Sequence, residues 1–198
     1  MMLALEGETM GAALKVKTVV KDIQTRIHGQ NKTDVLKWLT KVNPFTNHEA
    51  ARGKHEPGTG EWFLSSPEFT SWMLPGRSLW LHGSAGKTVL CSSIIESIKA
   101  RLSTYPLLFY FDFGDGQKQN MVNMLYSFLA QLAVISVPPE IQELYETCAL
   151  GTRHATIPRF KETLLSLANR LASDPRTTTY IVIDGLDECG DRNMLMRT

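Results

Sequence analysis

Two short groups of residues in this chain of 198 could do chemistry together. The first, Gly86–Thr88, places a lysine and then a hydroxyl directly after a glycine, and the second, Asp184–Glu188, contains three carboxylates. A lysine ammonium binds phosphate oxygens, and the hydroxyl that follows it is a ligand for Mg²⁺. A carboxylate after a buried strand can hold the same ion through its water shell, and another can polarise an attacking water. The two groups together indicate nucleoside triphosphate chemistry.

The lysine needs a strand that leads into a glycine-rich loop, and a helix that begins where the loop ends. Leu79–His82 is an apolar run typical of a strand, and a helix is predicted from about Lys87 to Arg101. Backbone N–H groups of such a loop and the positive end of the helix dipole surround an anion. The residues predicted to bind the nucleotide are Gly83, Ser84, Ala85, Gly86, Lys87 and Thr88.

This loop is two residues shorter than the usual phosphate-binding loop. In the spacing G-x-x-x-x-G-K-[ST] the first glycine would stand at Leu81, whereas the glycine present is Gly83. The difference removes about 7 Å of extended chain. Either the strand gives up two residues to the loop, or the ring of N–H donors stays incomplete. A Gly-Lys-Thr sequence after a strand can also arise by chance, so the loop alone does not establish nucleotide binding.

The acidic group is the stronger of the two signals. Asp184 directly follows a predicted strand, Thr179–Ile183. Ligand sites in parallel sheets lie at the C-terminal ends of strands, so Thr88 and Asp184 are the predicted Mg²⁺ ligands. Asp187 and Glu188 follow at the same strand end and are the predicted catalytic residues that orient water. The alternative is a solvated acidic turn after a core strand.

The rest of the pattern alternates strands with helices. Pro106–Phe113 is a continuous apolar and aromatic run, typical of a strand buried on both faces of a parallel sheet, and residues 120–135 and 157–172 are predicted helices. This order predicts an α/β fold with a parallel sheet. Nearer the N-terminus, apolar spacings of three and four over Ala12–Ile27 and 33–42 predict two packing helices.

The composition excludes several classes of function. A formal net charge of +1 gives no electrostatic case for nucleic acid as a partner. The three cysteines and five histidines are scattered, without the spacing of metal ligands or of a disulfide framework. No run approaches the roughly 18 apolar residues of a membrane span. We therefore expect a cytoplasmic protein without nucleic-acid or membrane partners.

Several segments together resemble one known family. The apolar residues and D-G-L-D-E of Ile181–Glu188 look like the Walker B motif of NACHT-type signal-transducing NTPases. "HEPGTGEWFLSSPEF" and "SLWLHG" are similar to the entry segment of fungal NACHT proteins, also described as a nephrocystin-like N-terminal domain. "LFYFDF" and "YSFLAQL" fit the same family in order, so the resemblance covers about Val35 to Asp191.

The resemblance implies a P-loop NTPase-type parallel sheet flanked by helices, which binds ATP or GTP with Mg²⁺. By this resemblance Lys87 contacts the β- and γ-phosphates, Thr88 and Asp184 hold Mg²⁺, and Asp187 or Glu188 supports hydrolysis. Thr59–Trp62 then lies near the adenine; its alternative role is a helix cap followed by a core aromatic.

The resemblance also implies a nucleotide-binding module of a signal-transducing switch of the STAND class, the N-terminal fragment of an NLR-like protein. The expected division is an N-terminal helical segment (1–42), a linker with entry helices (43–76), and a partial NACHT or P-loop NTPase domain (77–198).

Two departures from the family's pattern argue against efficient hydrolysis. The loop is short, and the chain ends at Thr198, before the further sheet strand that follows in the family. We therefore expect a truncated member, in which nucleotide binding or hydrolysis is impaired. Two alternatives stay open: a non-enzymatic interaction module that associates with itself or with full-length relatives, and a remnant without a function of its own.

Overall fold

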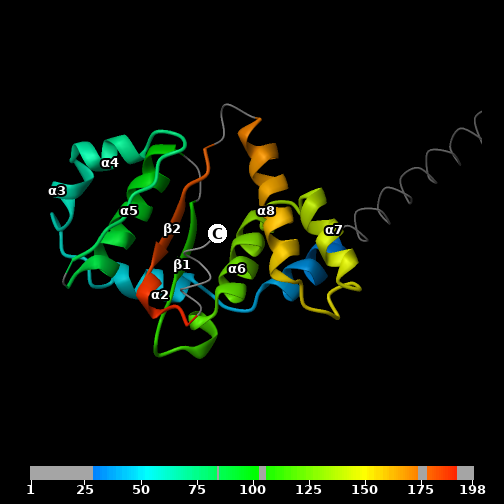
Figure 1. Cartoon of the computed structure of the whole chain (residues 1–198). Coiled ribbons are helices and arrows are strands. Elements are labelled where there is room, and N and C mark those ends of the chain that lie inside the picture. The colour runs from blue at the N-terminus through cyan, green and yellow to red at the C-terminus, as the bar shows by residue number, and fades with distance from the viewer. Residues whose placement is uncertain (1–28, 84, 103–105, 174–177, 191–198) are drawn as a thin grey trace, which may run out of the picture.

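The computed structural model describes residues 29–83, 85–102, 106–173 and 178–190 (Figure 1). The described chain is mixed α/β, mostly helical, and begins with a helix at residues 29–39. The elements that follow are α2 (Phe45–Arg52), α3 (Glu61–Leu64), α4 (Pro67–Trp72), α5 (Lys87–Leu102), β1 (Leu107–Tyr110), η1 (Gly116–Gln119), α6 (Met121–Ala133), α7 (Pro139–Thr147), α8 (Ile157–Ala172), β2 (Ile181–Asp184) and η2 (Leu186–Glu188). The predicted helix Ala12–Ile27 lies outside the described residues.

The described sheet has two parallel strands, β1 and β2. Leu107 lies opposite Ile181, and Tyr110 lies opposite Asp184. This pairing confirms the strands predicted within residues 106–113 and 179–183, although both are shorter, and β2 extends through Asp184. The last residue of each strand therefore stands at the same end of the sheet.

The predicted strand Leu79–His82 is wrong: this segment has no regular secondary structure. A strand is held by hydrogen bonds to a neighbouring strand, and in the described chain none lies beside these residues. Leu79 packs against the cluster that contains α5, but 62% of Trp80 is exposed. The larger P-loop NTPase-type sheet implied by the resemblance is not observed.

The two outer edges of the sheet differ. The side chain of Gln131, on α6, accepts a hydrogen bond from the Leu108 N–H (3.0 Å) and donates one to the Leu108 carbonyl (2.9 Å). These bonds close the edge of β1 to any further strand. In the described ranges β2 pairs only with β1, and no strand lies beside its other edge. The open edge of the sheet is therefore that of β2.

Alternation along β1 divides the core into two layers. Leu108 and Tyr110 pack into the cluster that contains α5, whereas Leu107, Phe109 and Phe111 pack into the cluster that contains α6. Figure 1 shows α5 on one side of the strands, with α6 and α8 on the other. The burial of all four residues of β1 confirms the strand predicted to be buried on both faces.

A third cluster holds helix 29–39 against α6, α7 and α8. Trp38 contributes the largest ring and packs edge-to-face against Tyr126 and Tyr145. Leu39 is fully buried, as predicted for the helix at 33–42. None of the helices in the described ranges is long and apolar enough to cross a membrane.

The segment 43–76, predicted as a linker with entry helices, contains the three short helices α2, α3 and α4. The cap of α4 is Ser66, whose hydroxyl accepts from the Phe69 N–H. Pro67 occupies the first position of α4, where the N–H that proline lacks would have no partner within the helix. Helix α2 was missed because it buries the polar side chain of His48.

Candidate nucleotide-binding site

The start of α5 and the end of β2 meet, and this contact brings together the two predicted groups. The hydroxyl of Thr88, in the first turn of α5, lies close enough to the carboxyl of Asp184, the last residue of β2, to lower its pKa as a hydrogen-bond donor. The charge of Lys87 also acts on Asp184. The two predicted Mg²⁺ ligands are thus neighbours in space, although they lie far apart in the sequence.

Asp184 has an unusual electrostatic position. Burial raises the pKa of its carboxyl, and this effect outweighs the hydrogen bonds from the Thr88 hydroxyl and the Gly185 amide and the nearby charge of Lys87. The neighbouring charge of Asp187 raises the pKa further. A cation that binds both the carboxylate and the neighbouring hydroxyl would stabilise the ionised form of this carboxyl.

The turn after β2 can be made only with a residue that tolerates a positive φ. Gly185 has φ of +67°, and a Cβ atom there would lie 2.8 Å from the carbonyl oxygen of Phe111. The Phe111 N–H, in turn, donates to the carbonyl of Asp184 at 2.9 Å. The D-G pair of the motif therefore holds Asp184 tightly against the end of β1.

The loop before α5 is closed by its own lysine. Gly86 has φ of +98°, a conformation that favours glycine, and its carbonyl accepts from the Leu90 N–H (2.9 Å) within α5. The Lys87 ammonium donates to the carbonyl of Gly83 at 2.8 Å. The ammonium therefore spans the loop that was predicted to receive a phosphate. Gly83, Ala85 and Gly86 are exposed, and Ser84 lies outside the described residues.

The two predicted catalytic carboxylates differ in their surroundings. Asp187 is exposed and close enough to act on the pKa of Asp184. Glu188 instead accepts a hydrogen bond from the Phe113 N–H at 2.7 Å, which braces the loop after β1. Of the two, Asp187 is placed nearer to the Thr88–Asp184 contact.

The predicted adenine segment lies beside α5. Gly60 caps α3 with φ of +87°, and a Cβ atom there would lie 3.1 Å from the Leu90 side chain, one turn after Lys87. Trp62 is 73% exposed, so it is not the core aromatic of the alternative interpretation. The helix-cap part of that alternative is confirmed.

The family described as "Nephrocystin 3, N-terminal" matches residues 58–198, well over half of the chain. The chain belongs to this family. Vegetative incompatibility protein HET-E-1 of Podospora anserina is 29% identical over 149 residues, which cover 71% of this chain and 11% of that protein. The chain therefore spans a small part of the length of this relative. No solved structure matches. The two matches support a NACHT-related domain.

Two pairs of polar residues support the site of this family member, and neither pair was predicted from the sequence. His48 and Tyr110 are buried and hydrogen-bonded to each other, and Asn47 donates to Asp112 at 2.8 Å. The available signal was the presence of Tyr110 and Asp112 within the otherwise apolar run of β1 and its continuation. Polar groups inside such a run need partners, and both partners lie on α2.

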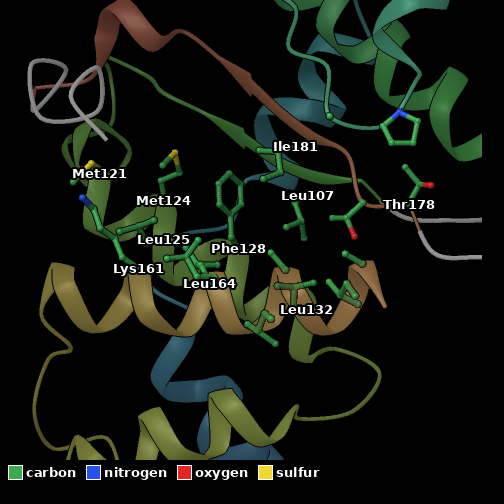
Figure 2. Close-up of a pocket in the computed structure, with 18 of the residues that line it drawn as sticks. Leu107, Met121, Met124, Leu125, Phe128, Leu132, Lys161, Leu164, Thr178 and Ile181 are labelled. Atoms are coloured by element: carbon green, nitrogen blue, oxygen red, sulfur yellow. The ribbon is translucent and has the colours of Figure 1, made fainter. Parts of the chain in front are cut away.

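A large cavity in the described part of the chain does not contain the predicted site residues. It has a volume of about 780 Å³ and lies between the strands, α6 and α8, as Figure 2 shows. Its lining is apolar apart from Lys161, Thr178 and Thr179. Phosphate binding needs several N–H donors and cations, and this apolar lining offers few of them.

The ionised carboxyl of Asp184 is expected to destabilise the folded chain at neutral pH. A carboxyl whose pKa is higher in the folded than in the unfolded chain binds its proton more tightly when folded, so ionisation at neutral pH lowers the free energy of unfolding. Asp184→Asn is expected to raise the free energy of unfolding at pH 7 by on the order of 1 kcal/mol. The gain should shrink as the pH falls through the raised pKa, because the wild-type carboxyl then becomes neutral too.

Urea unfolding at pH 7 and pH 5 measures this difference. Asp112→Asn is the matched control, because hydrogen bonds from Asn47 and the Gly114 amide lower the pKa of that carboxyl, and its loss should destabilise the fold at pH 7. A lower free energy of unfolding for Asp184→Asn at pH 7 would contradict the prediction.

Proposed function

We propose that this chain binds ATP or GTP with Mg²⁺ where α5 begins and β2 ends, as the nucleotide-binding module of a signal-transducing switch protein of the STAND class. The observation that carries the proposal is the proximity of Thr88 and Lys87, at the start of α5, to Asp184 at the end of β2, where both lower the pKa of its carboxyl. These residues supply a hydroxyl, a carboxylate and an ammonium, the three groups that Mg²⁺ and phosphate require.

The donor set suits a magnesium ion that is shared with phosphate. In the described ranges no group of three or more His, Cys, Asp or Glu side chains could form an all-protein metal site. Mg²⁺ usually keeps several waters and takes one or two protein ligands together with phosphate oxygens. Thr88 and Asp184 would hold it, and the bound ion would neutralise charge on the phosphates.

Hydrolysis by this chain is expected to be slow. Asp187 is the carboxylate placed to orient a water, whereas Glu188 is held by the Phe113 N–H. The Lys87 ammonium must leave the Gly83 carbonyl before it reaches a phosphate. Both features favour a binding module with weak turnover over an efficient NTPase.

Titration of Mg-ATP and Mg-GTP into the purified chain by calorimetry tests the proposal. We expect binding of at least one of the two nucleotides, and weaker binding when EDTA removes Mg²⁺, because Asp184 then faces phosphate without a cation between them. No binding of either nucleotide at millimolar concentration would overturn the proposal.

A second candidate function, pairing with another copy or with a longer relative, is favoured by the open edge of β2. In the described ranges no strand pairs with this edge, and an unpaired strand edge is a template for another strand. HET-E-1, of which this chain matches 11%, is a longer protein that carries the same region. Pairing of this kind needs no nucleotide.

A further inference from the structure

His48 joins α2 to α5, which begins at the candidate site, and to β1, the strand that pairs with β2. It is 2% exposed, and its ring nitrogens contact the Tyr110 hydroxyl of β1 at 3.0 Å (Nδ1) and the Glu96 carboxylate of α5 at 2.9 Å (Nε2). A carboxylate only accepts, so Nε2–H donates to Glu96, and Nδ1 accepts from Tyr110. Lys99 donates to the same Glu96 oxygen at 2.9 Å, and Arg52 lies 3.6 Å from the other.

The surroundings of His48 keep the imidazole neutral. Burial lowers the pKa of its ring, and the charges of Lys99 and Arg52 lower it further, against the opposing effect of Glu96. Burial also opposes the charge of Glu96, yet hydrogen bonds from His48 and Lys99 hold the pKa of that carboxyl below its ordinary value. At neutral pH one ring nitrogen therefore donates to Glu96 and the other accepts from Tyr110.

The network continues from Tyr110 to the neighbours of both predicted Mg²⁺ ligands. The Tyr110 hydroxyl also lies beside the thiol of Cys91: each side chain acts on the pKa of the other, and burial raises the pKa of the thiol to about 12. Cys91 lies one helical turn after Thr88 on α5, and Tyr110 is the residue that pairs with Asp184 across the sheet. Packing of Tyr110 against Cys91 therefore connects the beginning of α5 to the end of the strands.

Helix α2 is held in place from a second side. Asn47 donates to the Asp112 carboxylate at 2.8 Å, and the buried ammonium of Lys118 donates to the Asn47 amide oxygen. Asp112 belongs to the loop after β1, the loop that Glu188 braces at Phe113. A fixed α2 can therefore fix the spacing of the elements that His48 contacts.

We propose that His48 is a positioning residue for the Mg²⁺ site: through Tyr110 and Cys91 it sets the separation of Thr88, on α5, from Asp184, on β2. This role rests on the proposed nucleotide function. An apolar side chain of similar size could fill the same space, but it would leave the hydroxyl of Tyr110 without its acceptor and the carboxylate of Glu96 without one donor.

The test separates Mg²⁺-dependent from Mg²⁺-independent nucleotide binding. ATP affinity is measured by calorimetry with Mg²⁺ and with EDTA, and the thermal unfolding midpoint is measured alongside. Tyr110→Phe removes only the hydroxyl, and we expect a roughly tenfold loss of affinity for Mg-ATP with little change in EDTA. Tyr126→Phe is the matched control: its buried hydroxyl accepts from the Ala155 N–H at 3.0 Å, in the cluster remote from the site.

Two substitutions of His48 each keep one of its two side-chain hydrogen bonds and remove the other. His48→Asn keeps an oxygen near the position of Nδ1 that can accept from Tyr110, whereas His48→Gln keeps a donor near the position of Nε2 for Glu96. Since the path to the site runs through Tyr110, His48→Asn should retain more of the Mg-ATP affinity than His48→Gln. Tyr110→Phe keeps the test valid if a His48 variant does not fold.

The outcomes are distinct. A loss confined to Mg-ATP in Tyr110→Phe and His48→Gln, with Tyr126→Phe unchanged, supports the positioning role. Wild-type affinity in Tyr110→Phe, or an equal loss with Mg²⁺ and with EDTA, overturns it, because the residues then only stabilise the fold. If the wild-type chain binds neither Mg-ATP nor Mg-GTP, the proposed function itself is overturned, and this role with it; if it binds only Mg-GTP, the same comparison is made with GTP.

Discussion

Replacing Lys87 with alanine is expected to lower the affinity of the chain for Mg-ATP and Mg-GTP by roughly 10- to 100-fold. Its ammonium lies at the start of α5, beside Asp184 and 2.8 Å from the Gly83 carbonyl, where it can move to a phosphate without a change in the helix. A charge-assisted hydrogen bond to phosphate contributes about 1.5–3 kcal/mol, which corresponds to this range. Calorimetric titration of both nucleotides measures the change.

Lys161→Ala is the control for the general loss of a positive charge, because this exposed lysine lies on α8, away from the loop. Equal nucleotide affinity in Lys87→Ala and the wild-type chain would count against binding at this loop. The same variant separates the two candidate functions. Self-association through the open edge of β2, followed by light scattering, should be the same in Lys87→Ala, since neither the strand nor its exposed Ile181 is altered.

The segments that could be predicted from the sequence are those whose apolar residues follow the periodicity of a helix or the unbroken run of a buried strand. Helices α6 and α8 were predicted within a few residues of their bounds, because each buries one continuous apolar face. Strand β1 was predicted from an unbroken apolar run, since helices cover both faces of the sheet. Residues 79–82 have the same composition but no neighbouring strand in the described chain, and composition alone cannot reveal a missing partner.

The candidate site was predicted better than its supports. The pairing of Thr88 with Asp184 follows from the rule that sites in parallel sheets gather at strand ends, and the structure brings these side chains together. No such rule points to His48, because its partners on α5 and β1 are separated from it by 48 and 62 residues. The hydrogen bond that holds Glu188 to Phe113 is equally non-local, so the different surroundings of the two catalytic candidates could not be foreseen.

Lengthening the loop should increase nucleotide affinity. Inserting Ser-Gly between Gly86 and Lys87 gives the sequence G-S-A-G-S-G-K-T, which restores the standard spacing between Gly83 and the lysine. The two added residues return about 7 Å of extended chain and two N–H donors that can face the phosphates. We expect Mg-ATP or Mg-GTP to bind roughly tenfold more tightly than to the wild-type chain, as measured by calorimetry.

The same two residues inserted after Thr152, in the exposed turn between α7 and α8, provide a control in which chain length changes without the loop. The result tests whether the short loop limits binding. With the wild-type loop, the Lys87 ammonium reaches back to the Gly83 carbonyl at 2.8 Å, so part of the charge that a phosphate would use is already engaged. A longer loop moves that carbonyl away and frees the backbone to turn its N–H groups inward. If the inserted loop binds nucleotide no better than the control, the deficit lies elsewhere, in the two-stranded sheet that carries Asp184 rather than in the loop that carries Lys87.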